Sequence, residues 1–458
     1  MLVRVSNKLI VENAPQEVLA WCRLNLILDN PDYYKKERMG KWTGNTPKQI
    51  VLYEQIGSDI YLPFGCVRDF HSMFSNITAY NSEIHGFKRV LYNSNINLYD
   101  YQENAVKRIL GLKNGVIVMP CGAGKTQTAL ETVARIGGRT LWLTHTQDLL
   151  NQSYNRAKSV LDTSASYGKI TAGKVNIGQG ITFATVQTMS KLNLTAYKDI
   201  WDVIIVDECQ HCCGSPTRVT QFYKVLSNLS ARYKIGLTAT PKRADGLEQA
   251  MFALLGGIIH EVKREEVAHT TCPVRIVSRE TNYIPEYDAV LMGDGTLNYA
   301  KLVDDLIHDE ERFKVVVDEL HTLGTSLLVL ANRVDYIQRL NDAFSGKSVC
   351  LSTLGNSKKA KAQRKEALRK LNDGELDCIF ASYKLASEGL DCPNLRYIVL
   401  ATPEKDSTII EQSTGRVGRK ADGKECGTVI DFIDDFGMYK SWYKKRLAIY
   451  NRLKYDII

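Results

Sequence analysis

The stretch from Gly115 to Thr126 reads GVIVMPCGAGKT, and it decides how the rest of the chain is interpreted. An apolar run ends in a glycine-containing turn, and the turn leads into QTALETVARI, which has the pattern of a helix. Glycines let backbone N–H groups approach phosphate oxygens closely, and a helix N-terminus adds partial positive charge. Lys125 would neutralise the β- and γ-phosphates, and the Thr126 hydroxyl would bind Mg²⁺. The pattern predicts a phosphate-binding loop made of Pro120, Cys121, Gly122, Ala123 and Gly124.

A carboxylate pair favours this nucleotide site over an ordinary strand–turn–helix connection. That alternative exists because Met119 stands where the strict loop pattern has glycine. Asp207 and Glu208 follow the apolar run VIIV. A carboxylate at the carboxyl end of a neighbouring strand can hold the Mg²⁺ shell, and a second one can polarise the attacking water. We therefore predict that Asp207 binds Mg²⁺ together with Thr126, and that Glu208 is the general base.

Short apolar runs alternate with helical stretches around these features, which is typical of a parallel sheet flanked by helices. The first series of runs is Gly115–Met119, Thr140–Thr144, Ile181–Ala184, Val203–Val206 and Ile235–Thr238. The second is Ser326–Leu330, Ser348–Ser352, Asp377–Ala381, Arg396–Leu400 and Thr428–Phe432, with helices expected over Val334–Phe344 and Lys358–Asp373. Such runs suit strands buried on both faces. The chain is therefore expected to be an α/β protein with two domains of this kind in tandem.

The first 92 residues differ, because they are rich in Tyr, Asn and Lys and carry frequent turn signals. Runs at Gln49–Tyr53 and Asp59–Leu62 indicate strands of a small α+β domain. Residues 257–285 are interpreted as the region that joins the two α/β domains. The predicted order is an N-terminal domain, two α/β domains and a C-terminal basic helix, at residues 1–92, 93–265, 266–440 and 441–458.

Further motifs together resemble those of the superfamily 2 helicases and translocases. The segment Leu237-Thr238-Ala239-Thr240-Pro241, followed by Arg243 and Asp245, matches motif III. The other matches, in family order, are LYDYQ with Gln102, PCGAGKT, DECQ with Gln210, a segment from Ala381 to Asp391 with Gly389, and QSTGRVGR with Gln412, Arg416 and Arg419. Within the superfamily the chain looks most like the phage recombination helicases of the UvsW kind, and XPB and RecG are more distant.

This resemblance implies two RecA-like domains with ATP and Mg²⁺ bound at their seam. Residues of the motifs implied to contact the nucleotide are Gln102, Gln210, Gly389, Asp391 and Gln412. Arg416 and Arg419 would stabilise the charge that develops on the γ-phosphate, as an arginine finger does. The chain departs from the family at Gln210, where the DExH histidine is expected, and at Tyr99, where an arginine precedes the adenine-reading Tyr-Gln pair. Neither departure affects the phosphate chemistry.

Nucleic-acid contacts are expected from the resemblance and from composition. The resemblance points to residues at strand ends, whose hydroxyls, amides and backbone N–H groups suit phosphate contacts: Thr144, His145, Thr185, Gln187 and Ser382. A plain strand-end capping role is the alternative for each. Residues 32–48 combine cations such as Lys35 and Lys36 with aromatic rings such as Trp42, as a stacking surface for single strands requires. The basic, aromatic tail from Met438 is better interpreted as an amphipathic helix packed on the second domain.

The composition is that of a globular protein, with 458 residues, 44% hydrophobic and 24% charged. The net charge of +8 fits a polyanionic partner. The apolar runs are strand-length, so we expect no membrane partner, and the chain is expected to be a monomer in the cytoplasm, or in the host cytoplasm if it is viral. The eleven cysteines are interpreted as reduced thiols. Cys209, Cys212 and His211 are close in sequence, but a structural zinc site needs four ligands and no second pair has suitable spacing.

The sequence therefore predicts an ATP-dependent DNA helicase or translocase that remodels branched DNA, with the N-terminal domain as its DNA-recognition element. Its cofactors would be ATP and Mg²⁺, and its partners single-stranded and branched DNA. The junction preference rests on the resemblance. The alternatives are an RNA helicase, an ATP-gated nucleic-acid clamp that does not unwind, and the motor subunit of a restriction enzyme.

Overall fold

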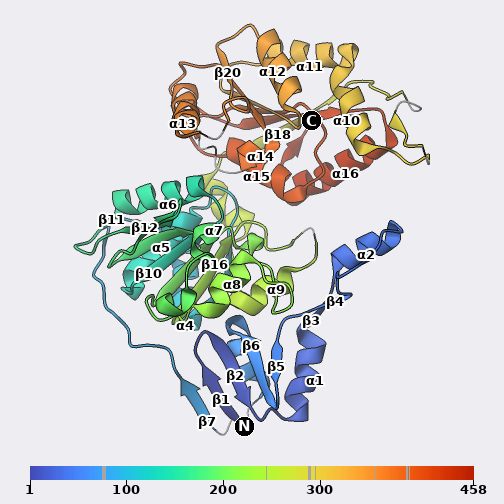
Figure 1. Ribbon diagram of the computed structural model, residues 1–458. Coiled ribbons are helices and arrows are strands. Elements are labelled where there is room, and N and C mark those ends of the chain that lie inside the picture. The colour runs from blue at the N-terminus through green and yellow to red at the C-terminus, as the bar shows by residue number, and fades with distance from the viewer. Residues whose placement is uncertain are drawn as a thin grey trace. The chain divides into compact units, whose positions relative to one another are not determined.

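The computed structural model of the protein describes residues 1–74, 79–243, 245–286, 290–293, 295–355, 357–387, 390 and 392–458. The chain forms two compact units (Figure 1). The first consists of Met1–Pro120 and Gly124–Lys263, and the second of Cys121–Ala123 and Arg264–Ile458. Each contains a mainly parallel sheet with flanking helices, and the first unit also contains a small N-terminal sheet. The predicted α/β class, with two tandem parallel-sheet domains and a small N-terminal α+β domain, is confirmed, whereas the predicted domain boundaries stay predictions.

The first α/β domain has an eight-stranded sheet, parallel except where β12 pairs with β13. In sheet order its strands are β13 (Lys174–Asn176), β12 (Gly168–Thr171), β14 (Ile181–Thr185), β10 (Thr140–Thr144), β15 (Val203–Asp207), β16 (Tyr233–Thr238), β9 (Asn114–Val118) and β17 (Ile258–Glu261). Its helices are α4 (Asp100–Leu112), α5 (Lys125–Ile136), α6 (Gln147–Val160), α7 (Val186–Met189), α8 (Gln221–Asn228) and α9 (Glu248–Leu255). Every residue of β9, β10, β14 and β15 is buried, as near-continuous apolar runs predict.

The second α/β domain has a seven-stranded sheet in which every strand pair is parallel. In sheet order its strands are β20 (Ser348–Cys350), β21 (Cys378–Ser382), β19 (Leu327–Ala331), β22 (Tyr397–Leu400), β23 (Gly427–Ile433), β18 (Val274–Glu280) and β24 (Asp456–Ile457). Its helices are α10 (Tyr299–His308), α11 (Glu310–Thr322), α12 (Val334–Ala343), α13 (Lys358–Asn372), α14 (Tyr383–Ser387), α15 (Ser407–Val417) and α16 (Gly437–Arg452). All ten apolar runs identified in the sequence contain strands of the two domains, with bounds within two residues.

The region predicted to join the two α/β domains is only partly a connection. Its residues include β17, the edge strand beside β9 in the first sheet, and β18, which pairs with β23 in the second. The interpretation was wrong here because both strands lie near sheet edges and carry charged side chains such as Glu261 and Arg275 among the apolar ones. A strand that buries one face alternates in polarity and lacks the continuous apolar run of a central strand.

The C-terminal residues differ in extent from the predicted helix over 441–458. Helix α16 begins at Gly437 and ends at Arg452, and β24 then pairs with β18. Tyr439, Trp442 and Tyr450 are buried in the core of the second domain. The packing interpretation of these aromatic side chains is therefore confirmed.

The N-terminal domain has a five-stranded sheet that is antiparallel except where β1 pairs with β7. Its elements are β1 (Leu2–Val5), β2 (Lys8–Glu12), α1 (Gln16–Asn25), β5 (Glu54–Ile56), β6 (Asp59–Pro63), η1 (Phe64–Cys66), α3 (Val67–Met73) and β7 (Ala79–Ser82). Between α1 and β5 the chain forms β3 (Ile27–Asp29), α2 (Pro31–Arg38) and β4 (Gln49–Val51).

This small domain packs directly on α9 of the first α/β domain. Leu247, Ala250 and Ala253 are buried among the core residues of the N-terminal sheet. The backbones also approach closely, because a Cβ atom at Gly65 would lie 2.3 Å from the Phe252 carbonyl oxygen. Only glycine permits this contact. Helix α9 thus contributes Ala250 and Ala253 to the core of the N-terminal domain, and Met251 and Leu254 to the separate core of the first α/β domain.

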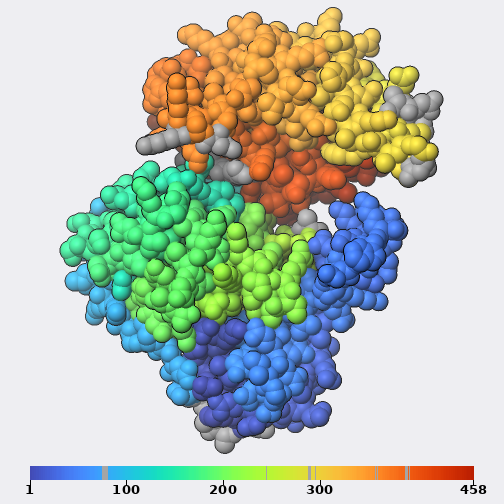
Figure 2. Space-filling view, in the orientation of Figure 1, coloured from blue at the N-terminus to red at the C-terminus, as the bar shows by residue number. Residues whose placement is uncertain are grey.

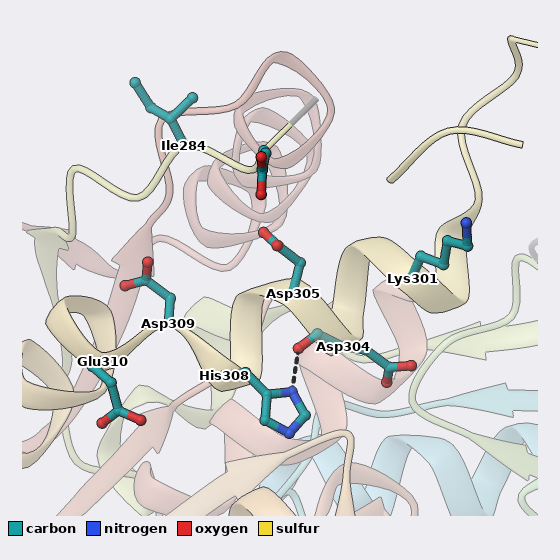
Figure 3. A pocket seen from close by; sticks show the side chains of 8 residues that line it. Ile284, Lys301, Asp304, Asp305, His308, Asp309 and Glu310 are labelled. Atoms are coloured by element: carbon teal, nitrogen blue, oxygen red, sulfur yellow. Dashed lines mark hydrogen bonds between the residues drawn. The ribbon is translucent and has the colours of Figure 1, made fainter. Parts of the chain in front are cut away.

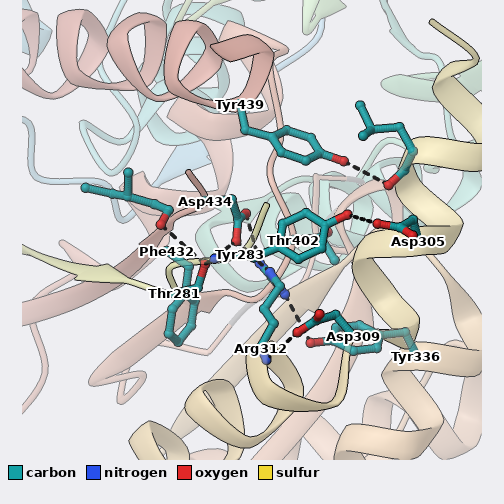
Figure 4. A network of polar contacts seen from close by, with 12 residues as sticks. Thr281, Tyr283, Asp305, Asp309, Arg312, Tyr336, Thr402, Phe432, Asp434 and Tyr439 are labelled. Carbon is teal, nitrogen blue, oxygen red and sulfur yellow. Dashed lines mark hydrogen bonds and ion pairs between the residues drawn. The ribbon is translucent and has the colours of Figure 1, made fainter. Parts of the chain in front are cut away.

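Two buried ion pairs fix helices of the second domain to its sheet. The Arg312 guanidinium of α11 donates two hydrogen bonds to Asp434, at 2.6 and 3.2 Å, and a third to the Tyr336 hydroxyl (Figure 4). On α16, Arg446 donates to Asp431 at 2.8 Å. Both arginines and both aspartates are almost completely buried. Removing one partner of such a pair leaves an uncompensated buried charge, at a cost of about 3–5 kcal/mol.

Candidate nucleotide and nucleic-acid sites

The predicted phosphate-binding loop connects β9 to α5 at the carboxyl edge of the first sheet. Pro120, Cys121, Gly122, Ala123 and Gly124 form this loop. Gly122 and Gly124 have φ angles of +85° and +79°, which a side chain would strain. Lys125 and Thr126 are the first two residues of α5, so the partial positive charge of the helix N-terminus lies at the loop. The Lys125 ammonium donates to the Met119 carbonyl at 3.4 Å, which holds it over the loop.

Asp207 is positioned as the last residue of β15, at the same edge of the sheet, and it is 5% exposed. Its carboxylate accepts hydrogen bonds from the Glu208 N–H at 3.1 Å and from the Ser153 hydroxyl at 3.5 Å. Burial and then the charge of Glu208 raise the pKa of Asp207 to about 7, while the Lys125 ammonium opposes that rise. Lys125 and Asp207 are therefore electrostatic neighbours, as the sequence predicted. A buried carboxylate beside a second one is a favourable ligand for a divalent cation.

Glu208 adopts a left-handed backbone conformation, with φ 52° and ψ 53°. Non-glycine residues with this strain are concentrated at functional sites. Its carboxylate accepts a 2.9 Å hydrogen bond from the side-chain amide of Gln210, which is itself buried. Arg243 donates to the backbone carbonyl of Gln210 and forms a two-bond ion pair with Asp245 at 2.9 and 2.7 Å. The segment after β16 is thus tied to the DECQ turn.

Gln102, the residue that the resemblance assigns to adenine recognition, lies against the phosphate loop, and its role in reading adenine stays a prediction. It is 2% exposed on α4, and its carboxamide oxygen accepts from the Tyr99 N–H at 3.0 Å. A Cβ atom at Gly124 would lie only 2.4 Å from the Gln102 amide nitrogen, so the glycine makes room for this side chain. The ring of Tyr99 stacks on Tyr101 with centroids 5.7 Å apart, in place of the arginine found in the family.

These side chains fit ATP with Mg²⁺. A Cβ atom at Gly124 would leave no room for the Gln102 side chain beside the loop. The loop offers an anion its backbone N–H groups, the N-terminus of α5 and the Lys125 ammonium. Thr126 and Asp207 supply the hard oxygen ligands that Mg²⁺ prefers. When held by these residues, Mg²⁺ would supply Lewis-acid stabilisation of negative charge on the phosphates.

Four predicted nucleic-acid residues meet at the carboxyl ends of β10 and β14, which pair in parallel with Thr144 opposite Thr185. Gln187 donates a 2.6 Å hydrogen bond to the His145 carbonyl. The Thr144 hydroxyl donates to the Thr146 carbonyl, and the Thr185 hydroxyl donates to the Thr188 hydroxyl. The structure thus groups these residues, and their hydroxyls also make the local contacts of strand-end caps. Their nucleic-acid role stays a prediction.

The sequence did not indicate two contacts at this edge. Ser153 reaches Asp207 from α6, and nothing in its local sequence marks it. The rings of His145 and His211 lie with centroids 4.0 Å apart. Burial, and then the charge of His211, lower the pKa of His145 to about 4, so this imidazole is neutral near pH 7. The position of His211 directly after the DECQ motif is the sequence signal that could have pointed to this contact with His145.

The cysteines of the DECQ region have a packing role. Cys209 and Cys212 are fully buried in the core of the first α/β domain. Burial raises the pKa of both thiols. They are therefore protonated and apolar in character near pH 7.

In the second unit, Gln412 and Arg416 lie on α15, and Arg419 follows that helix. The Arg416 guanidinium donates to the Leu390 carbonyl, and the Arg419 N–H donates to the Arg416 carbonyl at 3.3 Å. The Ser382 hydroxyl, at the end of β21, accepts from the Leu385 N–H. Gly389 and Asp391 lie outside the described residues. The arginine-finger role of Arg416 and Arg419 stays a prediction.

The second domain also has a cavity of about 630 Å³ whose wall is mainly acidic (Figure 3). Its lining residues are Ile284, Glu286, Lys301, Asp304, Asp305, His308, Asp309 and Glu310. The Lys301 ammonium donates to the Leu291 carbonyl, and the His308 ring contacts the Asp304 carbonyl at 2.6 Å. Carboxylates concentrated in this way repel phosphates, so the cavity is unsuited to a nucleic-acid backbone.

Among the helices in the described ranges, none combines the length and apolar character needed to cross a membrane.

Two protein-family models match the chain, one in each α/β domain. Residues 95–243 match "Type III restriction enzyme, res subunit", and residues 311–421 match "Helicase conserved C-terminal domain". The first span contains the phosphate loop and the DECQ motif, and the second contains Arg416 and Arg419.

Curated relatives include viral and archaeal proteins. A protein of Acanthamoeba polyphaga mimivirus, named as an ATP-dependent RNA helicase, is 29% identical over 352 residues, which is 75% of this chain and 64% of that protein. The DNA 3'-5' translocase XPB2 of Sulfurisphaera tokodaii is 35% identical over 179 residues, 39% of this chain and 38% of that protein. The chain thus spans less than two thirds of the length of either relative.

Solved structures with TM-scores above 0.5 share the fold at low sequence identity. The type ISP restriction-modification enzyme LlaBIII bound to DNA aligns with 78% of this chain and 30% of that chain, with a TM-score of 0.55 and 16% identity. T4 UvsW aligns with 100% of this chain and 99% of that chain at 19% identity, with a TM-score of 0.41. With the two models matched in chain order, one in each α/β domain, the chain is a helicase of the superfamily 2 type.

Proposed function

We propose that this protein hydrolyses ATP to move along DNA, and that it shifts junctions in branched DNA. The proposal is carried by one observation, the grouping of Lys125, Asp207 and Glu208 at one edge of a parallel sheet. This grouping supplies phosphate neutralisation, a metal ligand and a base, which phosphoryl transfer to water requires.

Each of these residues has a separate role in the proposed reaction. The loop N–H groups and Lys125 bind and neutralise the β- and γ-phosphates. Thr126 and Asp207 hold Mg²⁺. Glu208 accepts the proton of the attacking water, and Gln210 fixes the orientation of the Glu208 carboxylate through its 2.9 Å hydrogen bond. Arg416 and Arg419 stabilise the charge that develops on the γ-phosphate. ATP favours the closed arrangement of the two domains, so its binding and hydrolysis shift the populations of the closed and open arrangements.

DNA is the proposed track because of the basic chain, the N-terminal domain and the relative that is named a DNA translocase. RNA is the second candidate, and the mimivirus protein that is named an RNA helicase favours it. A clamp that binds nucleic acid in response to ATP, without directional movement, is a third.

Steady-state ATPase measurements test the proposal directly. The additions compared at one fixed salt concentration are none, single-stranded DNA, duplex DNA, a four-way junction and single-stranded RNA, because phosphate contacts depend steeply on salt. Lys125→Ala is the control for contaminating activity, since it removes the phosphate-neutralising ammonium. We expect the largest stimulation with branched DNA.

The possible outcomes separate the candidates. Stimulation mainly by RNA would establish the second candidate instead. Equal rates of strand displacement from a tailed duplex and a four-way junction would contradict the junction preference. Nucleotide-dependent binding without displacement would favour the clamp.

A further inference from the structure

An arm extends from the N-terminal domain between β3 and β4. It consists of residues 27–51, with β3 and β4 paired at its base and α2 and a loop at its end (Figure 1). Asn30 closes this base, because its N–H donates to the Lys48 carbonyl at 3.0 Å and its side-chain amide to the Pro47 carbonyl at 2.8 Å. Asn30 is 2% exposed and also caps α2. These hydrogen bonds close the base of the arm, so the loop between α2 and β4 is held at both ends.

The indole of Trp42 is displayed at the end of this arm. It is 86% exposed, whereas most other aromatic side chains in the described ranges are buried or half-buried. One side of the ring lies on the backbone of Gly44, where a Cβ atom would come within 2.7 Å of it. Gly44 has a φ of +49°, and the turn around it is closed by a 2.9 Å bond from the Thr46 N–H to the Thr43 carbonyl. The ring is thus seated against glycine while its surface stays accessible.

The arm that carries the exposed ring also carries a net positive charge. Five cations lie on the arm: Lys35, Lys36, Arg38, Lys41 and Lys48. Lys36 donates to the Thr46 hydroxyl at 2.7 Å, so one cation is fixed to the turn that holds the ring. Of the three carboxylates on the arm, Asp32 pairs with Arg218 of the first α/β domain at 2.9 Å. Figure 2 shows the arm at the surface of the first unit.

We propose that the arm binds DNA where a duplex opens, with Trp42 stacked on an unpaired base and the cations on the adjacent phosphates. A planar ring beside cations suits a nucleobase beside phosphates, whereas a protein partner would favour a wider apolar patch. A paired base inside a duplex presents no free face, so the stacking selects the junction of double and single strands. The inference rests on the proposed function only in taking DNA as the partner.

Equilibrium binding to three DNAs of matched length tests this inference. The DNAs are a blunt duplex, a fork, and a fork with 2-aminopurine at the first unpaired position, measured without nucleotide at one salt concentration. We expect Trp42→Ala to weaken fork binding about tenfold, in line with the loss of one base-stacking contact, and to leave blunt-duplex binding unchanged. Wild-type protein should quench the 2-aminopurine fluorescence, and Trp42→Ala should not.

Three further variants sharpen the test. Trp42→Phe should retain part of the quenching, because it keeps an aromatic ring. Gly44→Ala should lower it, because a Cβ atom displaces the ring. Leu24→Ala replaces another exposed apolar side chain of the same domain, 83% exposed, and should bind all three DNAs like the wild type.

If Trp42→Ala weakened binding to the fork and to the blunt duplex equally, the stacking role would be overturned. Unchanged fork binding by Trp42→Ala would also overturn it, and would indicate that a protein partner occupies the arm. These failures are distinct from failure of the proposed function. In that case the wild-type ATPase would be stimulated mainly by RNA or by no nucleic acid at all.

Discussion

The hydroxyl of Thr238 donates a 2.7 Å hydrogen bond to the side-chain carbonyl of Gln210. The amide nitrogen of the same Gln210 side chain donates to Glu208, so one carboxamide joins the proposed base to the strand end of β16. Both Thr238 and Gln210 are buried, and Thr238 in turn accepts from the Thr240 N–H at 3.0 Å. Glutamine can fill the position of the family's histidine here because it donates at one end and accepts at the other.

Replacing the Gln210 carboxamide should remove the hydrogen bond that orients the proposed base, Glu208. We expect Gln210→Ala to lower the kcat of the stimulated ATPase about ten- to hundredfold, because a hydrogen bond to a charged group is worth about 1.5–3 kcal/mol. The KM for ATP should change less than kcat. Steady-state kinetics measure both, and Gln55→Ala, an exposed glutamine of the N-terminal domain, is the matched control. An unchanged kcat in Gln210→Ala would show that the carboxamide does not orient Glu208.

Glu208→Gln keeps the size of the side chain and removes its ability to take a proton. We expect turnover to fall about 10²–10⁴-fold, the usual contribution of a positioned base. Binding of ATP and DNA should persist, because the phosphate contacts come from the loop and Lys125. Single-turnover hydrolysis and a fluorescent-nucleotide titration separate these effects. Normal turnover in Glu208→Gln would reassign the base.

Arg419→Ala tests the proposed finger. An arginine finger is typically worth about 10³–10⁵ in rate, so hydrolysis should nearly vanish while ATP affinity changes far less. The adjacent Lys420→Ala is the control for a general loss of positive charge, because Lys420 is exposed. Equal losses in the two variants would argue against a specific role for Arg419.

Lys234 makes stability depend on pH. Its side chain is fully buried on β16, where the ammonium donates to the Leu226 carbonyl at 2.9 Å and lies 4.4 Å from the Phe64 ring centroid. Burial lowers the pKa of Lys234 to about 7. In the unfolded chain a lysine holds its proton up to a pH of about 10.4. Between these values the unfolded state binds more protons, so the free energy of unfolding rises with pH and is lowest below about pH 7.

Replacing Lys234 with methionine should remove this dependence. We expect Lys234→Met to have a higher Tm than the wild type at pH 7, by about 2–4 °C for each kcal/mol gained, with the difference shrinking toward pH 10. Thermal unfolding followed by circular dichroism measures it, with the exposed Lys224→Met of α8 as control. A lower Tm for Lys234→Met at pH 7 would mean that its two contacts outweigh the burial of charge.

The central strands and the phosphate loop were predictable because their signals are local. A fully buried parallel strand such as β10 needs a continuous apolar run, and the loop needs glycines followed by Lys125. Edge strands such as β17 were not predictable, because a strand that buries only one face carries charged side chains on the other. The contact of Ser153 with Asp207 depends on how α6 lies against the sheet, which local sequence does not encode.

The close seating of Gly65 on the end of α9 has a mechanical consequence. Helix α9 follows the segment of Thr238, Arg243 and Asp245, and its apolar face belongs to the core of the N-terminal domain. The N-terminal domain and the first α/β domain lie in one compact unit, and we expect them to move together. A fragment that starts at residue 93 would expose the apolar face formed by Leu247, Ala250 and Ala253, and would aggregate instead of yielding a minimal motor.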